Sequence, residues 1–111
     1  MYTEAQTRRG AEFYGRECGS CHGEGLNGKD EAPALVGSGF LATWDGQSVG
    51  DLFEQTRKSM PQDKEGAFTR QEYLDVIAYI LSANELPAGA AELPRDALSL
   101  GQIRIVQFPS R

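Results

Sequence analysis

The five residues Cys18-Gly19-Ser20-Cys21-His22 constrain this chain more than any other part of its sequence. They contain the only two cysteines and the only histidine among 111 residues. Two cysteines at this spacing are typical of a redox-active dithiol, of half a zinc site, or of a haem attachment site. Each alternative places different demands on the fold, so the choice among them comes first.

This chain lacks the residues that accompany a zinc site or a redox-active dithiol in other proteins. A structural zinc site takes four ligands, usually cysteine or histidine, and no second ligand pair at zinc spacing follows this run. A thioredoxin-like dithiol begins a helix that follows a strand, whereas this pair follows a predicted helix and precedes a glycine-rich stretch. The run therefore predicts covalent haem: Cys18 and Cys21 bind the two vinyl groups, and His22 becomes an axial ligand of the iron.

The opposite face of the iron needs a second ligand, and methionine or histidine is usual there. The only internal methionine is Met60, 38 residues after His22. We therefore predict that His22 and Met60 are the metal ligands. With both faces filled, the iron has no open position for oxygen, peroxide or substrate. This favours an electron carrier over an enzyme. We therefore predict that the chain has no catalytic residue. The alternative is a haem sensor or peroxidase-like enzyme with an open sixth site.

Hydrophobic spacing predicts three helices and one short helical turn. The helices cover residues 3–18, 48–58 and 69–83, and the turn covers 39–44. Each helix begins with a pair at the spacing of a capping box. These pairs are Thr3 with Gln6, Ser48 with Asp51, and Thr69 with Glu72. An apolar stripe on the last helix predicts a core face. The small Gly10 would let another helix approach the first one closely.

The last 26 residues, 86–111, contain three prolines and lack helical periodicity. We predict an extended tail that either wraps the haem domain or begins a linker, with Ile103, Ile105 and Phe108 on the body. The predicted division is a haem domain at 1–85 and a tail at 86–111.

Charge and hydropathy exclude some partners. The net charge is -5, and the basic side chains form no cluster, so we expect no nucleic-acid binding. No apolar run approaches the ~18 residues that span a bilayer, so we expect no membrane span. Haem is attached covalently outside the cytoplasm in bacteria. We therefore expect a secretion signal to have preceded Met1 and a periplasmic or otherwise extracytoplasmic monomer.

These residues together resemble class I cytochrome c over roughly residues 3–84. Gly10 and Tyr14 precede Cys18 by eight and four positions, where that family places a glycine and an aromatic residue. The residues that match its C-terminal helix are Val76, Tyr79 and Ile80. The resemblance implies an all-α fold of three to four helices around one covalent haem c. It also implies that the first and last helices cross near Gly10 and Tyr79.

The resemblance also implies roles for residues near the haem. Pro33 matches the proline whose carbonyl accepts a hydrogen bond from the ligand histidine, here His22, which makes that histidine a better donor. Leu35 matches the leucine packed on the haem face.

The haem propionates have three candidate partners. By analogy with the family, Trp44 donates its indole N–H to a propionate; the alternative is an aromatic at the rim of the core. Arg57 and Lys58, just before Met60, are candidates for a propionate or a protein partner, although such charges are more often solvated.

Finer detail is similar to the cytochrome domains of quinohaemoprotein alcohol dehydrogenases and to free carriers of that style. The motifs that carry this likeness include Ala32-Pro33-Ala34-Leu35, Met60-Pro61 and Tyr79-Ile80-Leu81-Ser82-Ala83-Asn84. The likeness implies a single-haem cytochrome that accepts electrons from a dehydrogenase domain or partner. It would pass them to a respiratory acceptor, such as an oxidase or another cytochrome.

Overall fold

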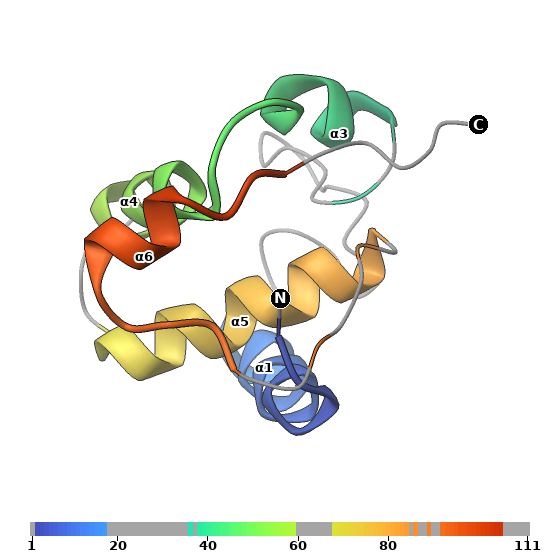
Figure 1. The fold of residues 1–111 in the computed structure, drawn as a ribbon. Helices are drawn as coiled ribbons and strands as arrows, with labels where there is room; N and C mark the ends of the chain where they lie inside the picture. The colour runs from blue at the N-terminus through green and yellow to red at the C-terminus, as the bar shows by residue number, and fades with distance from the viewer. Residues whose placement is uncertain are drawn as a thin grey trace.

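Five helices form the regular structure in the computed structural model, which describes residues 2–17, 36, 38–59, 68–84, 86, 89 and 92–105. The helices are α1 (Glu4–Glu17), α3 (Ser38–Trp44), α4 (Val49–Ser59), α5 (Arg70–Ala83) and α6 (Ala97–Gly101). Figure 1 shows α1 packed across α5, and α6 beside α4. Within those residues, the only β-type pairing is one antiparallel bridge between Ser48 and Arg104. The all-α prediction is confirmed, with five helices among the described residues where three to four were expected in the whole chain.

Two of the predicted capping boxes are complete. At α4, the Asp51 N–H donates to Ser48 Oγ at 3.0 Å, and the Ser48 N–H donates to Asp51 Oδ2 at 3.0 Å. At α5, the Glu72 N–H donates to Thr69 Oγ1 at 3.1 Å, and the Thr69 N–H donates to Glu72 Oε1 at 2.8 Å. Each box satisfies two backbone donors that a helix start leaves unpaired, which fixes where these helices begin.

The start of α1 differs from its prediction in one half of the box. The Thr3 hydroxyl accepts the Gln6 N–H at 3.1 Å, as expected. The Gln6 carboxamide is buried instead: it donates to Asp75 Oδ1 at 3.3 Å and accepts the Leu93 N–H at 2.9 Å. A buried amide must be hydrogen-bonded, so its partners come from α5 and the tail.

The core lies mainly on α5, whose predicted apolar stripe is confirmed. Its buried apolar side chains are Tyr73, Leu74, Val76, Ile77, Ala78, Ile80 and Leu81. From α4 the fully or almost fully buried residues are Val49, Leu52 and Phe53. Burying one large apolar side chain contributes about 1.5–3 kcal/mol, so α5 holds the helices together.

The helices α1 and α5 cross at Gly10, as predicted. A Cβ atom built there would lie 1.9 Å from the Asp75 carbonyl oxygen and 3.0 Å from the Cβ of Tyr79. The rings of Tyr14 and Tyr79 pack beside the crossing, with centroids 5.4 Å apart. Only a residue without a side chain permits this approach of one backbone to the other.

The described part of the tail packs on residues that precede it, within the predicted domain at 1–85. The Gly89 N–H donates to the Tyr2 carbonyl at 2.6 Å, and Glu92 pairs with Arg9 at 2.7 Å. Further on, the Ile105 N–H donates to the Gln47 carbonyl at 2.8 Å. These contacts run from the start of α1 to the turn before α4. The domain boundary between residues 85 and 86 stays a prediction.

The tail also contains α6, in a segment expected to be extended. Asp96 caps this helix by accepting the Ser99 N–H at 2.9 Å, and Leu100 is fully buried. Ile105 is buried and Ile103 partly buried on the body, as expected, whereas Phe108 lies outside the described residues. Five residues with one buried side chain are too few to produce a recognisable helical period.

Candidate functional site

Six of the seven predicted site residues lie outside the residues that the structure describes. They are Cys18, Cys21, His22, Pro33, Leu35 and Met60. Their roles stay predictions. The seventh, Trp44, is described, and so are the helices that lead into the predicted site, so its surroundings can be built from those helices.

Two described helices contain the sequence neighbours of predicted site residues. The last residue of α1 is Glu17, which precedes Cys18, and the last residue of α4 is Ser59, which precedes Met60. Both helices pack on α5. Val36, which follows the predicted haem-contacting leucine, is partly buried against the core. The packing on α5 therefore fixes the positions from which both segments depart.

A row of aromatic rings runs from α1 to α4. Phe13 meets Phe68 edge-on, with centroids 4.6 Å apart and the planes at 89°. Phe68 packs on Tyr73 at 5.4 Å, and Tyr73 packs on Phe53 at 6.3 Å. Such pairs contribute about 0.5–1.5 kcal/mol each beyond the area they bury. These rings belong to the core, where they join α1, α5 and α4.

Trp44 is the last residue of α3 and is partly buried against the core. Its ring lies 6.5 Å from that of Phe40, which is 5% exposed. The chain then turns at Gly46, whose φ of 84° is in the left-handed region that glycine adopts without strain. Trp44 therefore stands at the edge of the core, and its bond to a propionate stays a prediction.

One donor on α4 has no partner among the described residues. The Nε of Arg57 is buried and unbonded, while Nη2 of the same guanidinium donates to Glu54. A buried donor left unsatisfied costs about 1–3 kcal/mol. Arg57 lies three residues before Met60. The chemistry of the predicted donor set, two thiols, one imidazole and one thioether, is what fits a covalent haem c.

A charge network around the buried Asp75, not expected from the sequence, joins α1, α5 and the tail. Asp75 is 7% exposed and accepts from Arg9 Nε and Nη2, both at 3.1 Å, and from Gln71 Nε2 at 2.8 Å. Hydrogen bonds from Arg9 to Asp75, and then to Glu92, raise the pKa of Arg9. The sequence does carry one signal for this network. Asp75 is a carboxylate within the apolar stripe of α5, and a buried carboxylate requires hydrogen-bond donors.

Asp96, at the start of α6, is a second group whose pKa is shifted. The Ser99 N–H donates to Asp96 and lowers the pKa of that carboxyl.

Within the described ranges, no group of three His, Cys, Asp or Glu side chains is placed to hold a metal ion. No helix in the same ranges is long and apolar enough to cross a membrane.

Comparison with known proteins gives a family and a fold. Residues 5–80 match the family model described as cytochrome c oxidase, cbb3-type, subunit III. The structure is similar to the crystal structure of the sulfane dehydrogenase SoxCD from Paracoccus pantotrophus, with a TM-score of 0.62 and 19% identity. That match covers 89% of this chain and 52% of the other, so this chain spans about half the length of the relative. Among curated proteins, none matches this chain.

Proposed function

The chain belongs to the cytochrome c family described as cytochrome c oxidase, cbb3-type, subunit III, and on that premise we propose that it is a single-haem carrier of one electron. The matched residues, 5–80, include both the Cys18–His22 run and Met60. The expected cytochrome c fold is confirmed by this membership and by the similarity to SoxCD. The observation that best supports the proposal is that α1 and α4, both packed on α5, contain the residues next to Cys18 and Met60 in the chain, Glu17 and Ser59.

In the proposed site, Cys18 and Cys21 would hold the porphyrin through two thioether bonds, and His22 and Met60 would be the ligands of the iron. When bound, haem supplies a one-electron couple between Fe(II) and Fe(III). The soft thioether of Met60 favours Fe(II) and raises the reduction potential. With both His22 and Met60 as ligands, the iron would have no open position for a substrate, which suits a carrier of electrons.

Three further residues complete the proposed site. The Pro33 carbonyl accepts the outer N–H of His22, which fixes the ring and strengthens it as a ligand. Leu35 excludes water from one face, and Trp44 donates its indole N–H to a propionate. The position of Trp44 at the edge of the core supports that last role.

The proposed partners are a dehydrogenase that donates electrons and a respiratory acceptor. The structural relative is itself described as a sulfane dehydrogenase, and this chain spans about half of it, which supports a dehydrogenase as donor. Redox partners typically meet over small interfaces, which allow rapid release. The narrower likeness to quinohaemoprotein alcohol dehydrogenases stays a prediction, as does the extracytoplasmic location.

The proposal is tested on the full chain, produced together with a c-type haem maturation system. We expect one haem per chain that survives acid–acetone extraction, and that replacing Cys18 and Cys21 with serine makes it extractable. The oxidised protein should show the weak far-red band of Fe–S(Met) ligation. Met60→Ala should remove that band and let the reduced protein bind carbon monoxide, whereas Met60→His should close the iron again at a lower potential.

Lys58→Gln is the matched control, because this exposed residue of α4 lies two positions before Met60. It should leave the far-red band and the carbon monoxide response unchanged. A wild-type protein that lacks the band and binds carbon monoxide readily would instead support the sensor or peroxidase-like alternative.

A further inference from the structure

Residues 92–105 of the tail, which we call the strap, are tied to α1 at their first end. The buried Gln6 carboxamide accepts the Leu93 N–H at 2.9 Å, and Leu93 is itself only 3% exposed. Beside this bond, Glu92 pairs with Arg9 at 2.7 Å, with both side chains partly in water. An exposed ion pair contributes little to stability, whereas a buried N–H that loses its acceptor is costly. The first end of the strap therefore depends mainly on Gln6.

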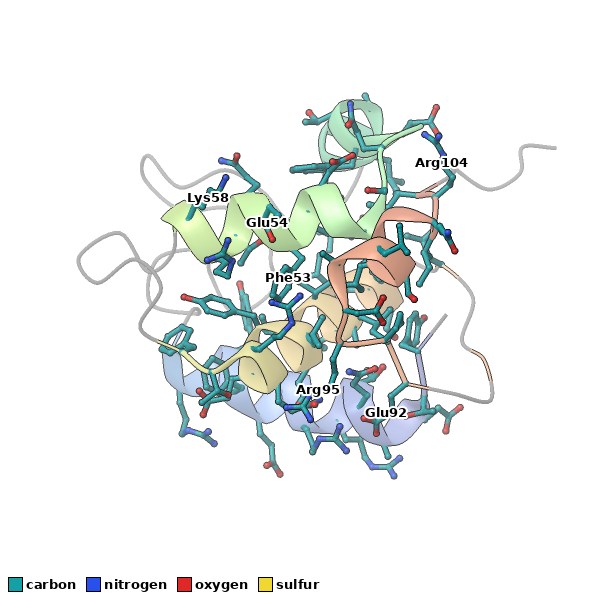
Figure 2. All side chains as sticks on the ribbon, turned by 60° about the vertical axis from the view of Figure 1, so that its left-hand side comes forward. Phe53, Glu54, Lys58, Glu92, Arg95 and Arg104 are labelled. Carbon is teal, nitrogen blue, oxygen red and sulfur yellow. The ribbon has the colours of Figure 1, made fainter. Side chains whose placement is uncertain are left out.

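The other end of the strap is tied to the start of α4. The Val49 N–H, the first of that helix, donates to the Ile103 carbonyl at 2.7 Å. A helix offers its first N–H groups no acceptor of its own, so the strap caps α4. Figure 2 shows Glu92 at the α1 edge of the molecule and Arg104 at the α3 edge, so the strap runs across the view between them. One continuous segment of chain thus ties α1 to α4.

Between its two ends, the strap contacts α4 through α6. A Cβ atom built at Gly50 would lie 3.0 Å from the Gly101 nitrogen, and Leu100 is completely buried. A cleft of about 190 Å³ nevertheless remains between the two helices, lined by Glu54 and Ala97 among others. The packing of α6 on α4 is therefore close at one point and incomplete beside it. Segments with few packed apolar contacts open at a lower free energy than the core of a protein does.

The contact between α1 and α5 is of a different kind. These two helices are in more extensive contact than any other pair of the described helices, and their backbones meet at Gly10. In comparison, α4 reaches α5 through the rings of Phe53 and Tyr73, whose centroids are 6.3 Å apart. Proteins open in contiguous cooperative units. The described helices therefore divide into a firm pair, α1 with α5, and a second group, α4 with the strap.

We propose that the strap couples α4 to the α1–α5 pair, and that α4 and the strap open together while α1 and α5 stay joined. Opening the strap removes the acceptor of the Val49 N–H, the burial of Leu100 and the tie to Gln6 in one event. Because α4 loses its cap in that event, its own opening becomes easier. The protein thus has a second, partly open conformation in equilibrium with the closed one. This inference uses described residues alone and does not rest on the function proposed above.

The first test is native-state amide exchange on the haem-loaded full chain in increasing, sub-denaturing urea. We expect the slowest amides of α4 and α6 to converge on one opening free energy and one urea slope. Both values should lie below those of α1 and α5, which exchange through global unfolding. The wild-type protein alone decides this point. If the amides of α4 exchanged with those of α1 and α5 and not with those of α6, or if all four helices opened at one free energy, the proposed coupling would be refuted.

Gln6→Met and Gln71→Met form a matched pair of variants for the second test. Both glutamines donate to Asp75 Oδ1, at 3.3 and 2.8 Å, but of the two only Gln6 also accepts an N–H from the strap. Gln6→Met should therefore leave the buried Leu93 N–H unsatisfied and speed exchange in both α4 and α6 by about 10-fold. Gln71→Met should change the exchange of the same amides by less than about twofold. Equal effects of the two variants, or acceleration confined to α6, would overturn the inference.

Discussion

Gly10→Ala is the sharpest test of the packing between α1 and α5. The added Cβ would lie 1.9 Å from the Asp75 carbonyl oxygen and 2.6 Å from its carbonyl carbon. Ordinary contact begins at 3.4 Å, so relief requires a separation of 3.4 − 1.9 = 1.5 Å. Both atoms belong to the backbone of α5 and cannot rotate away as the end of a side chain would. The two helices must therefore move apart.

The expected cost follows from two opposing effects. Overpacking a core costs about 1–3 kcal/mol, and alanine is better than glycine in a helix by about 1 kcal/mol. The movement also separates the Tyr14 and Tyr79 rings and stretches the bonds between Arg9 and Asp75. We therefore place the net loss near the upper part of the overpacking range, at about 2–3 kcal/mol.

Urea denaturation of the haem-loaded protein measures this loss as a lower midpoint at unchanged slope. Gly15→Ala is the matched control in the same helix, because a Cβ there meets nothing within 4 Å. It should stabilise the protein by about 0.5–1 kcal/mol. The two substitutions should thus have opposite signs. If Gly10→Ala were neutral, or if both variants lost stability equally, the close crossing would be refuted.

Four further predictions concern the charge network, a helix cap and the tail. Asp75→Asn removes the charge that holds a half-exposed arginine and should cost about 1–2 kcal/mol in the same titration, whereas no loss would make the network incidental. Ser48→Ala removes the cap of α4 and should cost about 1 kcal/mol; a change below a few tenths would contradict the capping box. Leu100→Ala should cost about 2–4 kcal/mol and speed amide exchange in α6, while Leu98→Ala, at a side chain 76% exposed, should stay within about 0.5 kcal/mol; equal effects would mean that α6 is not docked. The pKa of Asp96 is lowered in the folded chain, so its stabilisation is present above the ordinary value of 3.8 and is lost as the pH falls through the lower folded-state value. Amide exchange in α6 should therefore accelerate in acid, and Asp96→Asn should weaken that dependence; an unchanged acid response in this variant would assign it to another group.

Local signals in the sequence predict most of this fold. The ranges 48–58 and 69–83 fall within one residue of α4 and α5 at each end, because capping boxes act between residues three apart. The partners that a side chain finds far away in the sequence leave no such local signal. Gln6 had the spacing of a capping residue, yet its burial against Asp75 gave it another role.

The candidate site divides in the same way. The sequence alone predicts the role of Cys18 to His22, because haem attachment needs those residue types in that order. The unpaired Nε of Arg57 is a property of three-dimensional packing and has no counterpart in the sequence pattern. In the tail, the only local sign of α6 was Asp96 three residues before Ser99, which is the spacing of a helix cap.

The contact between Gly10 and Asp75 joins positions 65 residues apart and so closes one large loop of chain. Every residue proposed to hold the haem lies inside that loop. The entropy of closing a loop grows only with the logarithm of its length, so doubling the loop costs about 0.6 kcal/mol. Insertions between α1 and α5 are therefore inexpensive as long as the two helices still meet. A fold closed in this way can change the surface around its haem, and with it the choice of redox partner, while the joined helices stay the same.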